Sequence, residues 1–298
     1  MKIFLTGKNG QLGYQVERDL SKSHEIIATD RDTLNLIDPQ AIEDSIHQAK
    51  PDLIINAAAY TNVDRAEKEK DLAYQINAFA PKILAEAAKA LDIPIIHIST
   101  DYIFDGSKKN AYEEEDEANP LSVYGKTKWQ GEEFIRQNPK HFILRTSWLF
   151  SSHGHNFLKT IIKLAQEKTS LNLVDDQWGV PTSVKTLNEA IQTIIQYIDQ
   201  QNNSDVYGTY HVVSGGETNW YLYAIKILEI LEFFEIELKL KKNEIYPISS
   251  LYYLQEAERP KNSRMNTLKF KNTFNMELPD WENELQDTIS KIIKDLNK

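Results

Sequence analysis

Short apolar segments alternate with amphipathic segments along the first half of the chain. The apolar runs have the length of strands, and a 3.6-residue apolar period fills the intervals between them. We therefore predict strands at 2–6, 25–29, 51–59, 93–98 and 142–150, and helices at 14–20, 41–49, 71–91 and 124–138. Near-continuous apolar strands separated by helices are typical of a parallel sheet with both faces covered. The pattern predicts an α/β fold with a Rossmann-type doubly wound parallel sheet.

The alternation becomes less regular after residue 150. Further helices are predicted at 157–167, 186–199, 220–234 and 279–296, and short strands at 171–174 and 208–214. We expect residues 1–150 to form a dinucleotide-binding domain that about 183–214 complete. Residues 151–182 and 215–298 are then expected to form a smaller C-terminal α/β domain that binds the substrate.

Composition narrows the class of protein. The 298 residues are 41% hydrophobic and 26% charged, which is ordinary for a globular protein with a substantial core. The net charge of -10 argues against binding to nucleic acid or to an anionic membrane, because both partners need a basic face. Cysteine is absent, no apolar run reaches membrane-spanning length, and the sequence starts with a strand rather than a secretory signal. We expect a cytoplasmic protein with no nucleic-acid or membrane partner.

A glycine-rich loop follows the first predicted strand and precedes a helix. Its sequence is Gly7-Lys-Asn-Gly10-Gln-Leu-Gly13. Gly7 allows the tight turn, Gly10 lets the backbone approach a pyrophosphate, and Gly13 lets the helix pack close to the strand. The helix N-terminus would face the phosphates. The loop therefore predicts a dinucleotide site, whose further contacts are Asn9, Gln11 and Leu12.

The next two strands end in residues that suit the rest of a dinucleotide. Asp30 stands about twenty residues beyond the loop, where an acid can hydrogen-bond the adenosine ribose. Arg31 can stack on adenine or meet a 2′-phosphate, so the choice between NAD and NADP stays open. The third strand ends in small residues, which let a flat cofactor lie against the backbone. The predicted contacts there are Ala57, Ala58, Ala59 and Tyr60.

Tyr124 and Lys128 stand four residues apart on a predicted helix, so the phenol and the ammonium can point into one pocket. A nearby cation favours the phenolate and brings a pKa near 10 closer to the neutral range. Thr100 follows a buried strand and reaches the carboxyl edge of the sheet, where ligands bind. A hydroxyl, a phenol and an ammonium beside a hydride donor suit carbonyl reduction or alcohol oxidation.

Other chemistries find less support. His153 and His155 share a loop without a third ligand at suitable spacing, so no metal site is predicted. A G-x-S-x-G elbow is absent, which disfavours a serine hydrolase. His97 lies inside an apolar strand and is interpreted as a satisfied core residue rather than a catalyst.

Several longer motifs accompany these residues. They are GKNGQLG (7–13), NAAAYTNVDRAE (56–67), HISTDYIFDG (97–106), YGKTKWQGE (124–132), RTSWLF (145–150), DQWGVPT (176–182) and RPKNS (259–263). Over nearly the whole length the chain resembles the extended short-chain dehydrogenase/reductases, and within them the dTDP-4-dehydrorhamnose reductases. The resemblance implies an NAD(P)H-dependent oxidoreductase that reduces the C4 ketone of dTDP-4-dehydro-L-rhamnose to dTDP-L-rhamnose, a nucleotide sugar.

The resemblance also implies roles for individual residues. Thr100, Tyr124 and Lys128 are the implied catalytic trio, with NADPH or NADH as the cofactor. Trp148 and Asn156 are implied to border the sugar or the nucleotide, although Trp148 also fits core packing. Arg259 is implied to hold the diphosphate, although it equally fits an interdomain salt bridge. The expected substrate contacts are Thr100, Asp101, Tyr102, Trp148, Asn156 and Arg259.

Two positions depart from the family's pattern. Some relatives bind Mg2+ at a dimer contact through acidic residues, one of them in the first helix, where this chain has Gln15. Mg2+ and that dimer are therefore not carried over, and a monomer or a homodimer is expected. Asn35 stands where the family often has aspartate, near the adenine, which again leaves NAD or NADP open.

Two other functions fit the same loop and Tyr/Lys pair. A nucleotide-sugar epimerase or dehydratase shares both, although Tyr102 follows Asp101 where dehydratases commonly place glutamate. A noncatalytic regulatory subunit with the same fold is an alternative from another class, which the intact catalytic trio disfavours. Net consumption of NADPH with the ketone would separate all three functions.

Overall fold

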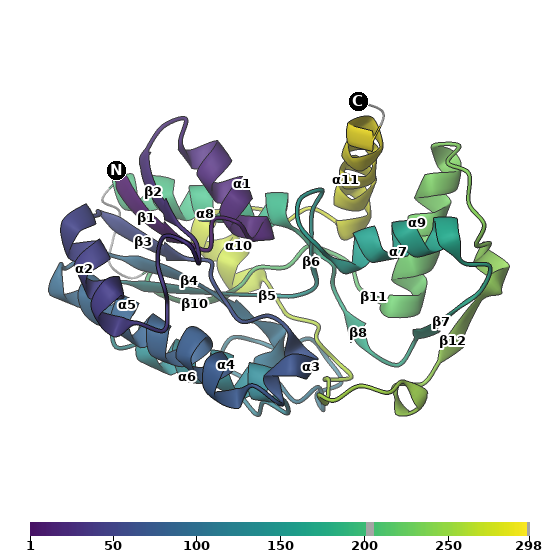
Figure 1. The fold of residues 1–298 in the computed structure, drawn as a ribbon, viewed down its shortest axis with the longest axis horizontal. Coiled ribbons are helices and arrows are strands. Elements are labelled where there is room, and N and C mark those ends of the chain that lie inside the picture. The colour runs from purple at the N-terminus through teal and green to yellow at the C-terminus, as the bar shows by residue number, and fades with distance from the viewer. Residues whose placement is uncertain (201–205, 297–298) are drawn as a thin grey trace.

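The computed structural model describes residues 1–200 and 206–296 (Figure 1). Residues 201–205, inside the segment predicted to complete the first domain, and residues 297–298 lie outside this description. Figure 1 shows a larger part built on a sheet with helices on both faces. A smaller part contains α7 (Phe157–Glu167) and α9 (Trp220–Phe233).

A six-stranded sheet organises the larger part, in the order β10-β5-β4-β3-β1-β2. Its strands are β1 (Lys2–Thr6), β2 (Glu25–Thr29), β3 (Leu53–Asn56), β4 (Ile95–Thr100), β5 (His141–Thr146) and β10 (Gly208–His211). All neighbouring pairs in it are parallel. The chain leaves β1 first toward β2 and then toward β3, so the strand order switches beside β1, where doubly wound sheets bind ligands. The predicted Rossmann-type α/β fold is confirmed.

Helices cover both faces of this sheet. The helices are α1 (Gln11–Leu20) and α8 (Val184–Asp199) on one face, and α2 (Pro39–Ala49), α5 (Ala80–Ala90) and α6 (Val123–Ile135) on the other (Figure 1). Leu5 and Ile55 join the hydrophobic cluster under α1 and α8, whereas Phe4 and Ile54 join the cluster under α2 and α5. Because successive strand residues face opposite covered sides, the strands are apolar throughout.

Local capping signals set where the helices begin. Asp38 caps α2 by accepting a hydrogen bond from the amide of Ala41, and Pro39 occupies the first turn. The hydroxyl of Ser122 accepts a hydrogen bond from the amide of Gly125 at the start of α6. This second cap fixes the first turn of the helix that carries Tyr124.

Three predicted elements differ in the structure. The helix predicted at 71–91 comprises α4 (Lys70–Tyr74), a π-helix (Gln75–Phe79) and α5. The strand predicted at 51–59 ends at Asn56, and the one at 142–150 divides into β5 and β6 (Leu149–Phe150) because Trp148 takes a left-handed φ of 47°. Apolar periodicity reports burial rather than the backbone hydrogen-bond pattern, so it did not indicate these breaks.

The smaller part packs around its own hydrophobic cluster, which includes Tyr223, Leu228 and Leu285. In it α9 packs against α7 and against α11 (Trp281–Leu296). β7 (Leu171–Val174) pairs in parallel with β12 (Ile245–Ile248), which the sequence pattern did not predict. None of the helices in the described ranges is both long and apolar enough to cross a membrane.

α10 (Leu268–Phe274) is another element that the pattern did not predict. It packs against α8 and β10, and Phe270 and Phe274 belong to the cluster on that face of the sheet. The chain therefore returns to the larger part after building most of the smaller one. The domain boundaries given above stay a prediction.

Gly131 on α6 sets how closely this helix approaches the π-helix. A Cβ atom at position 131 would lie 2.2 Å from the carbonyl oxygen of Asn77. We predict that Gly131→Ala lowers the free energy of unfolding by about 1–3 kcal/mol, because the two backbones must separate. Urea denaturation measures the change. Gln130→Ala, on the exposed side of the same helix, is the matched control and should change stability by less than about 0.5 kcal/mol. Equal stability of the two variants would contradict the close contact.

Candidate functional site

The glycine loop lies directly against the backbone that follows β3. Gly7 has a φ of 79°, and a Cβ atom there would lie 2.9 Å from the Cα of Ala58. A Cβ atom on Gly13 would lie 2.1 Å from the carbonyl oxygen of Gly7, so α1 starts in contact with the loop. Gly10 is the N-cap of α1 and provides no side-chain cap. The first amides of α1, from Gln11 onward, are thus available to a phosphate group.

Asp30, at the end of β2, is joined to the glycine loop. Its Oδ2 accepts a hydrogen bond from Asn9 at 2.8 Å and lies 3.5 Å from the Nζ of Lys8. Its Oδ1 accepts hydrogen bonds from the hydroxyl and the amide of Thr33 at 2.9 and 3.1 Å. The Thr33 hydroxyl above all holds the pKa of Asp30 below its usual range. Asp30 therefore stays charged, with Lys8 as a countercharge that the sequence analysis did not consider.

Asn77 fixes the segment that carries the predicted contacts Ala57 to Tyr60. Its Oδ1 accepts a hydrogen bond from the amide of Tyr60 at 2.7 Å, and its Nδ2 donates to the Tyr60 carbonyl at 3.1 Å. Nδ2 also lies 3.2 Å from the hydroxyl of Thr127 on α6. Asn77 thus ties the end of β3 to the helix of Tyr124. The sequence analysis missed this role, and the signal that could have found it is an amide side chain inside the alanine-rich segment predicted as a helix at 71–91; the structure shows this side chain fully buried.

Thr100 and Tyr124 come together at the carboxyl end of β4. The Thr100 hydroxyl donates to Asp101 Oδ1 at 3.1 Å and accepts from the amide of Tyr102 at 3.2 Å, and it lies near enough to the Tyr124 phenol to affect its pKa. Burial raises the pKa of Tyr124 to about 12, which the nearby Thr100 hydroxyl opposes. The phenol is therefore held as a proton donor. The expectation that Lys128 lowers this pKa is not met in this structure.

Lys128 lies one turn after Tyr124 and is almost fully buried. Its Nζ donates to the carbonyl of Ile98 at 2.6 Å and lies 3.3 Å from the Nε2 of His97. Burial lowers the pKa of Lys128 to about 8, whereas the carboxylate of Glu132 raises it. At neutral pH the side chain is therefore mainly an ammonium ion. It is anchored by β4 and leaves one of its three N–H donors for another partner.

Six buried side-chain polar atoms have no hydrogen-bond partner among the described residues, and two of them belong to predicted substrate contacts: Asp101 Oδ2, next to Thr100 in the chain, and Arg259 Nε. Burial raises the pKa of Asp101 to about 6, against hydrogen bonds from Ser263 and Thr100. The charges of Arg259 and Asp101 both act on Tyr102, whose ring meets that of Tyr124 edge-on at 5.5 Å. Unpartnered polar atoms are rare in protein interiors. Their presence here indicates a site that a polar ligand completes.

Arg259 forms a salt bridge, which is the alternative role considered for it from the sequence. Its Nη2 lies 2.9 Å from Asp64 Oδ2, and Asp64 Oδ1 accepts a hydrogen bond from the amide of Ala257 at 3.1 Å. Asp64 belongs to the short helix α3 (Val63–Ala66), so this contact joins two distant stretches of chain. A diphosphate at Arg259 would compete with Asp64 for the same guanidinium.

Trp148 and Asn156 take positions that their motifs did not reveal. Trp148 stacks on Trp220 with ring centroids 3.6 Å apart and packs against Gly179, so its aromatic partner on α9 was missed. Asn156 accepts from the amide of Lys159 to cap α7, and its Nδ2 donates to Gln11 Oε1 at 2.8 Å. Its contact with Gln11 joins the 151–156 loop to the glycine loop.

A buried ion cluster lies beside Lys128, one turn further along α6. Glu132 binds Arg145 of β5 at 2.9 Å and Arg136 at 2.7 Å, and it also accepts a hydrogen bond from Ser99. Glu132 and Arg145 are each almost completely buried. Burial alone would raise the pKa of Glu132, but Arg145 in particular holds it below its usual range. The cluster fixes the rotation of α6 against the sheet.

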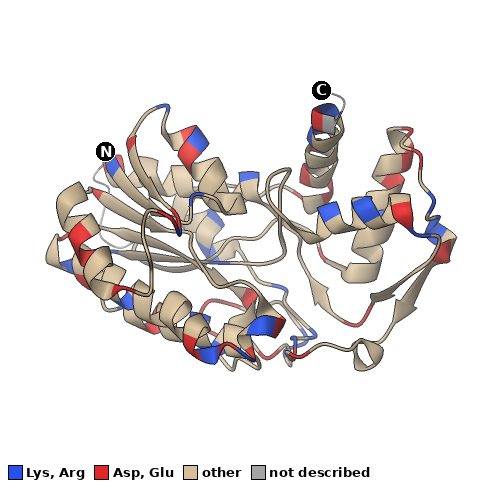
Figure 2. Ribbon diagram, in the orientation of Figure 1, with Lys and Arg blue, Asp and Glu red and all other residues tan. Residues whose placement is uncertain are grey.

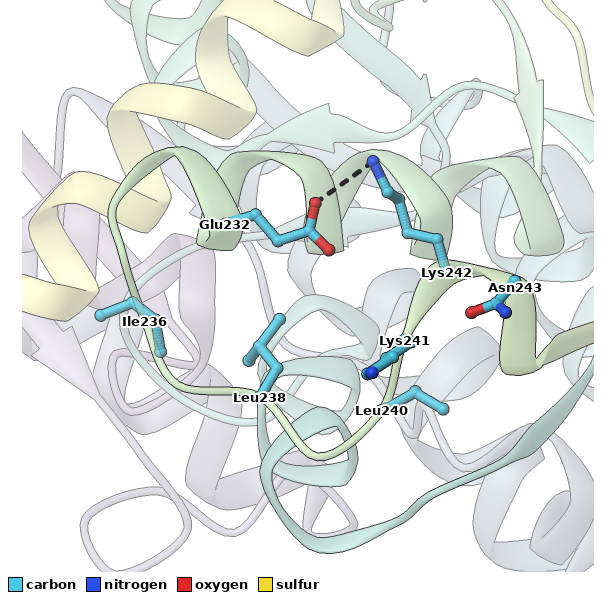
Figure 3. A pocket seen from close by; sticks show the side chains of 7 residues that line it. All are labelled: Glu232, Ile236, Leu238, Leu240, Lys241, Lys242 and Asn243. Atoms are coloured by element: carbon cyan, nitrogen blue, oxygen red, sulfur yellow. Dashed lines mark ion pairs between the residues drawn. The ribbon is translucent and has the colours of Figure 1, made fainter.

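Other surface features lie apart from this site. A pocket of about 470 Å³ opens beside the end of α9, lined by Ile236, Leu238 and Leu240 with the ion pair Glu232–Lys242 at its edge (Figure 3). None of the predicted site residues lines it. Figure 2 shows acidic and basic residues interspersed on the helices of both parts. Among the described residues there is no group of three or more His, Cys, Asp or Glu side chains that could hold a metal ion. Gln15, which stands where some relatives have an acidic residue, donates a hydrogen bond to Asp19.

The strand order, the glycine loop and the Tyr/Lys pair beside a strand-end hydroxyl define a Rossmann-type protein of the extended short-chain dehydrogenase/reductase class. The family model described as "RmlD substrate binding domain" matches residues 1–293, and the chain belongs to this family.

Named relatives agree with this assignment. The chain is 38% identical to the dTDP-4-dehydrorhamnose reductase of Sinorhizobium fredii, over 95% of this chain and 94% of that protein. It is 39% identical to the Salmonella typhimurium enzyme of the same name, over 95% of each chain.

Solved structures are similarly close. A dTDP-4-dehydrorhamnose reductase from Clostridium acetobutylicum superposes with a TM-score of 0.90 at 38% identity, covering 98% of this chain and 100% of that one. The Bacillus anthracis dTDP-4-dehydrorhamnose reductase in complex with NADP superposes with a TM-score of 0.88 at 35% identity, covering 97% of this chain and 99% of that one.

The ion cluster beside Lys128 makes stability depend on pH through Glu132. Because the folded-state pKa lies below the ordinary 4.5, the stabilisation is complete above about pH 4.5 and is lost as the pH falls through the folded pKa. We predict that Glu132→Gln lowers the free energy of unfolding by about 3–5 kcal/mol near pH 7, because Arg145 is left buried without its countercharge. The deficit should narrow near pH 3. Urea denaturation at both pH values measures it.

Glu133→Gln is the matched control, since Glu133 is half exposed and Arg136 is its one ion-pair partner among the described residues. It should change stability by no more than about 1 kcal/mol. A Glu132→Gln deficit that stays constant with pH would show that the carboxylate charge is not the cause.

Proposed function

We propose that this protein catalyses the NAD(P)H-dependent reduction of the C4 ketone of dTDP-4-dehydro-L-rhamnose to dTDP-L-rhamnose. The observation that carries the proposal is the meeting of Thr100 with Tyr124, one turn before Lys128, on a chain that matches named reductases over almost its entire length. The same placement suits a substrate carbonyl at the carboxyl edge of the sheet.

The residues of the glycine loop fit a dinucleotide. Side chains are excluded at Gly7 and Gly13, and the first amides of α1 are available for a pyrophosphate. We propose contacts from Asn9, Gln11, Leu12, Asp30, Arg31, Ala57, Ala58, Ala59 and Tyr60. When bound, the reduced nicotinamide supplies the hydride. The Bacillus anthracis reductase is a complex with NADP, and here Lys8 beside Asp30 provides a positive charge for a 2′-phosphate.

The catalytic trio then divides the work of proton transfer. Tyr124, with its raised pKa, keeps its proton until it is given to the carbonyl oxygen. The Thr100 hydroxyl hydrogen-bonds the same oxygen and orients it toward the phenol. Lys128 places its ammonium one turn away and, since it does not lower the pKa of the phenol, is proposed to act on the cofactor. Its free N–H is the proposed contact to the nicotinamide ribose.

The unpartnered atoms supply the substrate side of the site. We propose that Asp101 Oδ2 and Arg259 Nε bind the nucleotide sugar, with Tyr102 between them. The Arg259 guanidinium suits the diphosphate, which takes the place of Asp64. Trp148 offers an aromatic surface to the sugar or base, and Asn156 acts from the loop that contacts Gln11.

The remaining expectations accompany this proposal. Residues 1–150, completed by about 183–214, serve as the dinucleotide-binding domain, and 151–182 with 215–298 as the substrate-binding domain. The protein acts in the cytoplasm as a monomer or homodimer and needs no metal ion.

Tyr124→Phe removes the proton donor while keeping the ring. We predict that ketone-dependent NADPH oxidation falls by at least about 100-fold, because general acid catalysis is lost. NADPH binding, followed by fluorescence, should stay within about threefold of wild type. The substitution removes only the phenol hydroxyl, which contributes little to binding of the cofactor in the ground state. Tyr197→Phe on α8 is the matched control and should leave both unchanged. Full turnover in Tyr124→Phe would refute the assignment, and absence of turnover in the wild type would refute the substrate.

Lys8 sets the cofactor preference in this proposal. Lys8→Ala leaves the carboxylate of Asp30 with less countercharge, so a 2′-phosphate is repelled more strongly than a 2′-hydroxyl. We predict that the ratio of kcat/KM for NADPH to that for NADH falls roughly tenfold. Steady-state kinetics with both cofactors measures the ratio, with Lys22→Ala as the control. A ratio unchanged in Lys8→Ala would exclude this role.

A further inference from the structure

Three buried polar side chains form one row across the centre of the sheet. Thr6 of β1 is in register with Asn56 of β3, and Asn56 with His97 of β4. Residues in register on parallel strands point to the same face, so the side chains meet. The Thr6 hydroxyl donates to Asn56 Oδ1 at 2.7 Å, and Asn56 Nδ2 lies 3.0 Å from His97 Nδ1. Each of the three is at most 1% exposed.

The row continues from the sheet to the helix that carries the catalytic pair. His97 Nε2 lies 3.3 Å from Lys128 Nζ, whose other protein partner is the Ile98 carbonyl at 2.6 Å. Thr6 immediately precedes Gly7 and Asn56 immediately precedes Ala57, so the row underlies the contact between the glycine loop and the end of β3. One hydrogen-bonded line therefore joins the proposed cofactor cradle to the ammonium ion.

The charge of Lys128 decides where the proton on His97 lies. An ammonium ion can only donate, so Nε2 must accept, and the proton of a neutral imidazole must be on Nδ1. Nδ1–H then needs an acceptor on Asn56. The structure has Asn56 Nδ2 facing His97 and Oδ1 facing Thr6, so a charged Lys128 requires the Asn56 amide to turn over, which brings its oxygen to His97 and its nitrogen to Thr6. Burial, followed by the nearby charge of Lys128, holds the pKa of His97 well below its usual range, which keeps the ring neutral and able to accept.

We propose that His97 is a positioning residue of the reduction: it holds the Lys128 ammonium through Nε2, and the Asn56 amide, turned so that its oxygen faces His97, holds the Nδ1–H tautomer. The inference rests on the proposed function for its kinetic consequence. Two of the three N–H donors of the ammonium are then fixed by β4, at Ile98 and His97. Because the three N–H bonds are tetrahedrally arranged, fixing two of them also fixes the direction of the third. His97 is thus more than a satisfied core residue, which was the interpretation of the sequence.

The ionisable groups around Lys128 are few. Glu132 lies one turn later on α6 and favours the ammonium, and the neutral His97 faces it from β4. Tyr124 lies one turn earlier, where Asp101 adds a negative charge that acts on the phenol. Loss of the acceptor at His97 destabilises the charged form of Lys128. The pKa of Lys128 then falls. As a result, the decline of activity at alkaline pH begins at a lower pH than in the wild type.

Two substitutions separate the two ring nitrogens. In His97→Asn the amide can replace Nδ1 beside Asn56 but does not reach Lys128, whereas in His97→Gln the longer side chain can present its oxygen near the position of Nε2. We expect His97→Asn to lower kcat roughly tenfold, as for a lost hydrogen bond to a charged group, and to move the alkaline limb of the kcat profile to lower pH by about one unit. His97→Gln should retain the wild-type limb and most of kcat. KM for the ketone should be unchanged in both.

NADPH affinity measured by fluorescence between pH 6 and 10 gives a readout that needs no turnover. In His97→Asn the affinity should decline at lower pH than in wild type and His97→Gln. If His97→Asn does not fold, Asn56→Leu tests the row from its other end and should shift the same limb in the same direction. Wild-type pH profiles in His97→Asn, or equal defects in both His97 variants, would overturn the inference. Absence of turnover in the wild type would instead overturn the proposed function and leave the affinity test valid.

Discussion

The pairing of Glu132 with Arg145 is the interaction on which the site depends. It joins α6 to β5 at 2.9 Å in an almost fully buried setting, and Ser99 of β4 and Arg136 satisfy further positions on the carboxylate. A buried ion pair costs desolvation, so its net contribution to stability is small, but its directionality permits few alternative arrangements. Because Glu132 is four residues after Lys128, and Lys128 four after Tyr124, fixing Glu132 fixes the rotation of the helix face that carries Tyr124 and Lys128.

Close backbone contacts complete what the ion cluster begins. Glycine lets α6 touch the π-helix at Gly131 and the carbonyl of Tyr102 at Gly125, and it lets α1 touch the glycine loop at Gly13. At each contact a Cβ atom would lie within 2.2 Å of a carbonyl oxygen. The positions of Tyr124 and of the α1 amides are therefore set by backbone geometry rather than by flexible side chains.

The same burial that orders the site also tunes it. Burial raises the pKa of Asp101 to about 6 and lowers that of Lys128 to about 8, so both groups titrate closer to neutral pH than they would at the surface, whereas burial raises the pKa of Tyr124 to about 12 and keeps the phenol protonated. Asp101 Oδ2 and Arg259 Nε have no partner among the described residues, which is unfavourable for the protein alone. That cost is consistent with a site organised for a polar ligand rather than for stability.

The sequence alone determined the doubly wound sheet, because both-sided burial forces apolar strands and helices of regular period. It also determined the glycine loop and the Tyr124–Lys128 spacing, since these depend on neighbours within a few residues. Only the tertiary structure decided the parallel partnership of β12 with β7, the stacking of Trp148 on Trp220 and the bond between Arg259 and Asp64. Each joins residues more than 70 positions apart, and local pattern carries no information about such pairs. The row from Thr6 to Lys128 also depends on residues distant in sequence. In the sequence His97 stands inside an otherwise apolar strand, and only the register of three strands and the packing of one helix show its partners.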